Sequence, residues 1–142
     1  REEYAGANIL VAGPNFGTGS SREHAVWALQ DYGFAAVVSP GFADIFRNNC
    51  TKAGVVPVQV DPAIGRALLD ALEADPSLEI TIDVARGTLD VPAAGIETTF
   101  PMDEFTRARL LNGWDDIGLS LRHEDEIEAY EANRRPWLPT TR

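Results

Sequence analysis

Residues 8–24 read NILVAGPNFGTGSSREH, and this stretch decides the fold. Residues 8–12 are a short apolar run closed by Gly13-Pro14, a pattern that predicts a strand followed by a turn. Residues 15–21 form a glycine-rich loop, and a helix is predicted over about 21–32. A strand, a loop and a helix in this order are typical of an α/β protein.

The next residues repeat the alternation. Residues 35–38 and 55–60 read as strands, and Pro57 is tolerated near a strand start or at a sheet edge. Asp61 and Pro62 suit the start of another helix. Between the two strands a helix ending at Gly54 is predicted, and its shared apolar face consists of Phe42, Ile45, Phe46, Cys50 and Ala53. Strands that alternate with helices predict parallel pairing.

The second half of the chain has another pattern. Apolar residues alternate over 78–84 and 89–91, and 98–100 reads as a further strand, so a β-meander is predicted. Helices follow at 105–111, where Phe105, Ala108 and Leu111 share a face, and, as a short helix or turn, at 115–119. The last helix is predicted over 123–135, with Arg134 and Arg135 in its final turn and Pro136 ending it.

The expected fold is therefore a three-layer α/β domain. It has a small, mostly parallel sheet, a second β layer and C-terminal helices. No linker or internal repeat divides the chain, so residues 1–142 are expected to form one domain.

Composition excludes several classes of protein. The 142 residues carry 22 acidic and 12 basic side chains, a formal charge of −10, which argues against a nucleic-acid partner. A single cysteine, Cys50, rules out an intramolecular disulfide and a cysteine-built metal site in this sequence. No apolar run approaches the ~20 residues of a membrane span. A cytoplasmic domain that acts on a small molecule or another protein is expected, without a membrane partner.

The loop before the first helix is the candidate site. In open α/β folds, ligands bind at this end of the strands, and helix starts favour anions. Arg22 adds a guanidinium whose geometry matches a carboxylate or phosphate. Ser20 and Glu23 also match a capping box, in which Ser20 is the helix N-cap. The two interpretations are compatible.

Two other activities fit this loop poorly. A P-loop needs a lysine that is absent here, and Arg22 occupies the place of the last glycine in a dinucleotide-binding pattern. A Ser/His/Asp hydrolase would place its serine in a Gly-x-Ser-x-Gly elbow, which the sequence lacks. His24 is better read as a helix-face or partner-facing residue, and His123 as an exposed residue at a helix start.

The loop also carries a specific resemblance. Residues 15–25 resemble the signature of the swivel domain of the aconitase superfamily, and the resemblance continues through 36–38, 42–49 and 52–57. Residues 110–121 are similar to the tail of bacterial isopropylmalate dehydratase small subunits. The resemblance implies a three-layer β/β/α swivel domain, with a large subunit that carries a 4Fe–4S cluster as its heterodimer partner. Cys50 is then a core residue, and this chain binds no metal.

The resemblance further implies a hydro-lyase that dehydrates and rehydrates a hydroxy acid, as in leucine biosynthesis. By position, Ser20 becomes the alkoxide base, and Arg22 is catalytic and binds a substrate carboxylate. Gly19 and Ser21 join the substrate-binding loop, and the helix start and nearby N–H groups stabilise the alkoxide.

The start of the chain departs from the family pattern. Family small subunits begin with an Asp-Thr-Asp-like motif and a flexible substrate-recognition loop, and neither occurs here. The substrate therefore stays open among isopropylmalate, citrate, homocitrate and related acids. The alternatives are a homoaconitase or methylmalate type of dehydratase, or a non-catalytic module that only binds an anion.

Overall fold

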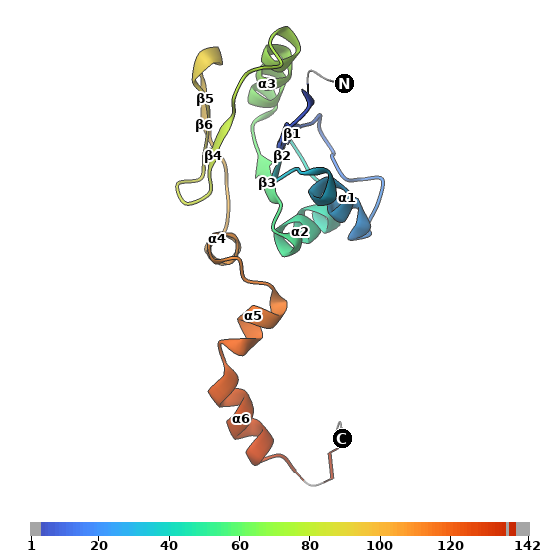
Figure 1. The fold of residues 1–142 in the computed structure, drawn as a ribbon, viewed down its shortest axis with the longest axis vertical. Coiled ribbons are helices and arrows are strands. Elements are labelled where there is room, and N and C mark those ends of the chain that lie inside the picture. The colour runs from blue at the N-terminus through green and yellow to red at the C-terminus, as the bar shows by residue number, and fades with distance from the viewer. Residues whose placement is uncertain (1–3, 136, 139–142) are drawn as a thin grey trace.

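The computed structural model describes residues 4–135 and 137–138. Its helices and strands follow the predicted order (Figure 1). In chain order they are β1 (Ile9–Val11), α1 (His24–Tyr32), β2 (Ala36–Ser39), α2 (Asp44–Ala53), β3 (Val56–Gln59), α3 (Pro62–Ala74), β4 (Thr81–Asp83), β5 (Thr88–Val91), the 3₁₀ turn η2 (Pro92–Ala94), β6 (Ile96–Thr99), α4 (Glu104–Asn112), α5 (Asp116–Leu121) and α6 (Glu124–Ala132).

Two small sheets form the body. β1, β2 and β3 pair in parallel in that order, with Leu10 opposite Val37, and Val37 opposite Pro57. Pro57 thus lies on an edge strand, as expected for a residue without a backbone N–H. β4, β5 and β6 pair antiparallel and form the predicted meander. The mostly parallel sheet and the second β layer are both confirmed.

The central strand β2 divides the core into two parts because successive side chains point to opposite faces. Val37 packs with buried residues of α1 and α2, among them Val26 and Phe46. Val38 packs on the other face with Leu68 of α3 and Leu89 of β5. The layers are therefore α1 and α2, then the parallel sheet, then α3 with the meander (Figure 1). This order confirms the predicted three-layer domain.

Several helix boundaries differ from the prediction. α1 begins at His24 instead of about residue 21. α2 begins at Asp44, so Phe42 precedes it and forms an isolated bridge with Phe16. Ile45, placed by the pattern on the buried face of that helix, is exposed. The predicted Asp61 cap is correct, since its carboxylate accepts the Ala63 N–H at 2.8 Å.

The C-terminal helices also need correction. The face of α4 that carries Phe105 and Leu111 is exposed, and Arg109 is the buried residue of this helix. α6 ends at Ala132, so Arg134 and Arg135 follow the helix instead of forming its last turn. His123 is confirmed at the helix start, and Pro136 lies outside the described residues. None of the described helices is long and apolar enough to cross a membrane.

Candidate functional site: the serine loop after β1

The loop from Gly13 to Glu23, here called the serine loop, is fixed at its root. The buried Ser39 hydroxyl donates to the Gly13 carbonyl at 2.8 Å and lies equally close to the Gly41 carbonyl. Phe16 donates its N–H to Gly41 at 2.9 Å, and its carbonyl accepts from Ala43 at 2.9 Å. The carboxyl end of β1 is thus joined to the connection after β2, where ligands bind in open α/β folds.

An aromatic cluster supports the middle of the loop. The buried Phe46 ring of α2 meets Phe16 edge-on at a centroid distance of 5.3 Å and stacks with Phe42 at 6.4 Å. Gly17 has φ +83° and lies directly on this ring, so a Cβ there would overlap Phe46. Glycine is required because both the backbone angle and the space exclude a side chain.

Beyond Gly17 the loop opens toward solvent. Ser20 is half-buried, whereas Gly19, Ser21 and Arg22 are exposed. The Ser20 Oγ accepts the Arg22 backbone N–H at 3.2 Å. No described residue pairs with the Arg22 guanidinium. The predicted residues thus lie together on one short segment, and the contact to the Ser20 hydroxyl is made by the backbone N–H of Arg22.

The capping-box prediction is wrong. Glu23 occupies the N-cap position of α1, and no described side chain caps that helix end. The amides of Ala25, Val26 and Trp27 donate to the carbonyls of Arg22 or Glu23 at 2.9–3.2 Å. These three N–H groups are therefore engaged within the turn. The contact that the structure provides to the Ser20 oxygen comes from Arg22 instead.

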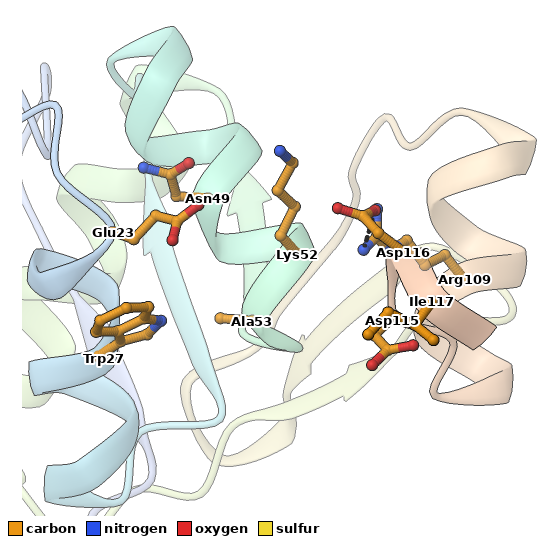
Figure 2. A pocket seen from close by; sticks show the side chains of 9 residues that line it. All are labelled: Glu23, Trp27, Asn49, Lys52, Ala53, Arg109, Asp115, Asp116 and Ile117. Carbon is orange, nitrogen blue, oxygen red and sulfur yellow. Dashed lines mark ion pairs between the residues drawn. The ribbon is translucent and has the colours of Figure 1, made fainter. Parts of the chain in front are cut away.

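A groove of about 560 Å³ begins at Glu23, the residue after Arg22. Figure 2 shows Glu23 and Trp27 on one side, Asn49, Lys52 and Ala53 of α2 in the middle, and Arg109 with Asp115, Asp116 and Ile117 across from them. Its charges are mixed. Ser20, Ser21 and Arg22 do not line it. The groove therefore separates the serine loop from the C-terminal helices.

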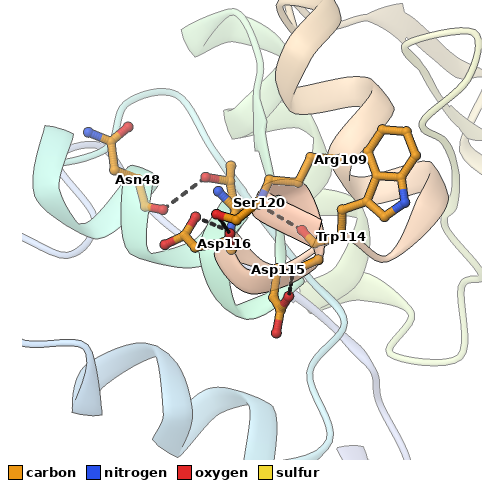
Figure 3. Close-up of polar contacts among 8 residues, drawn as sticks. Asn48, Arg109, Trp114, Asp115, Asp116 and Ser120 are labelled. Carbon is orange, nitrogen blue, oxygen red and sulfur yellow. Dashed lines mark hydrogen bonds and ion pairs between the residues drawn. The ribbon is translucent and has the colours of Figure 1, made fainter. Parts of the chain in front are cut away.

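Sequence reasoning missed Arg109 of α4, which ties the start of α5 to α4 (Figure 3). Its Nε donates to the Trp114 carbonyl at 2.9 Å, and its Nη2 lies 2.8 Å from Asp116 Oδ1. Asp115 caps α5 by accepting the Gly118 N–H at 2.6 Å. The Asp115-Asp116 pair before a helix was a visible signal, but no pattern marks Arg109 as buried.

The described residues do not fit an iron–sulfur cluster. Such clusters are usually held by several cysteine thiolates. Cys50 is fully buried, and desolvation raises the pKa of its thiol to about 12, so it stays protonated. No group of three or more His, Cys, Asp or Glu among the described residues could hold a metal ion.

Cys50 also gives a direct test of the packing of α2. At pH 8 we expect a thiol reagent to leave folded Cys50 unmodified and to label it fully in denaturant. Above pH 9 the unfolded thiol ionises while the folded one keeps its proton, so stability should fall as the pH rises from 9 toward 12. Rapid, stoichiometric labelling of the folded chain at pH 8 would contradict this burial.

Comparison with known proteins agrees with the fold and the loop. The family model described as the aconitase C-terminal domain matches residues 1–63, which include the serine loop. A solved structure titled 3-isopropylmalate dehydratase, from Methanocaldococcus jannaschii, is 26% identical with a TM-score of 0.62, and the alignment covers 87% of this chain and 68% of that one. Fold and loop together define an aconitase-type swivel domain.

More similar relatives narrow the class. The 3-isopropylmalate dehydratase small subunit of Frankia casuarinae is 60% identical over 139 residues, covering 97% of this chain and 70% of the relative. That of Acidothermus cellulolyticus is 56% identical over 142 residues, covering 100% and 71%. A second family model, the C-terminal domain of these small subunits, matches residues 116–141. The chain belongs to the 3-isopropylmalate dehydratase small-subunit family, whose members are subunits of a hydro-lyase.

Proposed function

We propose that this chain, as the small subunit of its dehydratase in leucine biosynthesis, supplies the base that isomerises 2-isopropylmalate to 3-isopropylmalate. The names of the relatives support the reaction. The observation that carries the catalytic assignment is the Ser20 hydroxyl, which accepts the Arg22 backbone N–H at 3.2 Å. No described residue pairs with the guanidinium of the same arginine. Residues 1–142 would act as one swivel domain.

Ser20 is the proposed base. A serine hydroxyl holds its proton tightly, so it removes a proton from carbon only if its alkoxide is stabilised. A hydrogen bond donated to Oγ favours the charged form, and the Arg22 N–H is placed to provide one. The positive charge of Arg22, two residues along the chain, would lower the cost of the negative charge further. The proton taken from the substrate would be held on Ser20 Oγ.

Arg22 is the proposed carboxylate-binding residue. Its side chain is exposed and lies two residues from the base in the chain, so one carboxylate of the acid could pair with the guanidinium while the reacting carbon approaches Ser20. Gly19 has no side chain, and the space where a Cβ would stand is open within 4 Å, so a ligand could approach the backbone closely there. Ser21 is assigned to the same contact surface, mainly through its backbone.

The other half of the active site is assigned to a large subunit. The described residues here do not fit a 4Fe–4S cluster, so the large subunit is proposed to hold that cofactor. The exposed serine loop would face it across the interface between the two chains.

Replacing Arg22 by lysine should raise KM for isopropylmalate roughly tenfold or more, since bonds to charged groups contribute about 1.5–3 kcal/mol and lysine cannot form the bidentate pair. Steady-state kinetics of the two-chain enzyme measure this. Arg66→Lys is the matched control, because Arg66 pairs with Asp70 on the exposed face of α3 and should not affect KM. Unchanged KM and kcat for Arg22→Lys would remove Arg22 from the site.

A further inference from the structure

The C-terminal arm, defined here as residues 115–135, leaves the body of the domain. Figure 1 shows α5 and α6 running away from both sheets. No residue of either helix is buried. Its root is fixed, because Arg109 binds both the Trp114 carbonyl and the Asp116 carboxylate. These contacts join the start of α5 to α4 at the root of the arm.

Four of the eleven exposed large apolar side chains among the described residues lie on this arm. Ile117 and Leu121 are 69% and 59% exposed, and Tyr130 is 65% exposed. Ile117 and Leu121 are four residues apart and Ile127 and Tyr130 three, so each pair forms one apolar strip on its helix. The helices have six and nine residues, and isolated helices below about 12–15 residues are marginal in water. A surface that covers these strips would stabilise them.

The charge of α6 favours a basic partner surface over a second copy of the arm. Five of the nine residues of α6 are acidic and none is basic. A second copy of the arm would bring acid against acid, which is unfavourable. A partner surface with an apolar groove and Lys or Arg at its rim would complement both features.

The two family models match separate parts of the chain. The aconitase C-terminal domain matches residues 1–63, whereas the model for the C-terminal domain of the small subunits matches 116–141, which includes α5 and α6. A domain that is the C-terminal part of one chain is held near its partner domains by the covalent link. A separate subunit lacks that tether and needs binding surface of its own.

We propose that the C-terminal arm docks on the large subunit, with its apolar strips in an apolar groove and the α6 carboxylates on basic residues at the groove's rim. This inference rests on the proposed two-subunit function and specifies the surface through which the subunits associate. The serine loop contacts the substrate, while the arm supplies affinity at a distance from it.

The test uses the full chain and its large subunit, with binding measured by calorimetry and turnover measured separately. The arm variant is Leu121→Ser with Tyr130→Ser, and its matched control is Phe105→Ser with Leu111→Ser, which alters equally exposed apolar residues on α4. The arm variant should raise Kd at least about tenfold. The control should leave Kd within about twofold. At saturating large subunit, the arm variant should recover the unaltered kcat because the serine loop is unchanged.

The remaining outcomes overturn the proposal. Equal Kd values for the unaltered chain and the arm variant would exclude docking through the arm. A change confined to self-association, seen as a shift in the mass of the chain alone, would assign the arm to a second copy instead. Failure of the unaltered chain to bind the large subunit would refute the two-subunit function itself. Calorimetry measures binding and does not depend on the activity of Ser20. A failure of the proposed catalysis by Ser20 can therefore be told apart from a failure of docking through the arm.

Discussion

Ser20→Ala should lower kcat of the two-chain enzyme by roughly 10²–10⁴-fold, the contribution of a placed acid–base group. Alanine removes the oxygen that accepts the Arg22 N–H. Ser20 is half-buried and its hydroxyl supports no core contact, so the fold should be unchanged. Affinity for the large subunit should therefore be close to that of the unaltered chain.

The control for this prediction is Ser77→Ala. Ser77 is an exposed serine in the turn after α3, where its hydroxyl lies 2.6 Å from Asp75. Its replacement should leave kcat unchanged. Turnover of a purified Ser20→Ala complex within about tenfold of the unaltered enzyme would show that another group removes the proton.

The second large effect is on stability. Phe46→Ala should cost about 3–5 kcal/mol of the free energy of unfolding, the usual range for a buried phenylalanine. The ring is 2% exposed and contacts Phe16, Phe42 and the backbone at Gly17. Its loss also removes the support beneath the serine loop, so kcat should fall even in the fraction that remains folded.

Denaturant unfolding of Phe46→Ala and Phe105→Ala measures this difference. Phe105 is an exposed phenylalanine of α4, and its truncation should change stability by no more than about 0.5 kcal/mol. Equal losses in the two variants, or a loss below about 1 kcal/mol for Phe46→Ala, would contradict the packing described for the loop.

The order of strands and helices was predictable because each signal was local and agreed with its neighbours. Apolar runs at 9–11, 36–38 and 56–58 became three paired strands, and Asp61 with Pro62 started α3 as predicted. The meander followed from alternation alone. These elements are strongly periodic, and no long-range contact opposes their preference.

The errors occurred where tertiary contacts outweighed a local pattern. Ser20 does not cap α1, because its hydroxyl binds Arg22 in a loop whose root is fixed by Ser39 and by the Phe16–Phe42 bridge. Phe105 and Leu111 share a face, but Arg109 turns the opposite side of α4 inward through its bonds to the next segment. The sequence pattern alone does not reveal which of these contacts form.

The candidate site was predictable from a single continuous segment. Ser20, Ser21 and Arg22 are adjacent in sequence, so their proximity required no knowledge of the fold. The group that donates a hydrogen bond to the Ser20 oxygen was harder to predict. The start of α1 and nearby backbone N–H groups were expected to stabilise the alkoxide. The amides of Ala25 to Trp27 are engaged within the turn, and the N–H that contacts Ser20 Oγ is that of Arg22, a nearby backbone group.

The most direct test of the proposed function is turnover after anaerobic mixing of the chain with its large subunit, whose cluster has been reconstituted. Alkene formation is followed by ultraviolet absorbance, with isopropylmalate, citrate and homocitrate offered side by side. We expect turnover of isopropylmalate alone. Turnover of another acid would keep the serine mechanism and change the substrate. No turnover of any acid by a stable complex with an intact cluster would contradict the account and favour a non-catalytic anion-binding module.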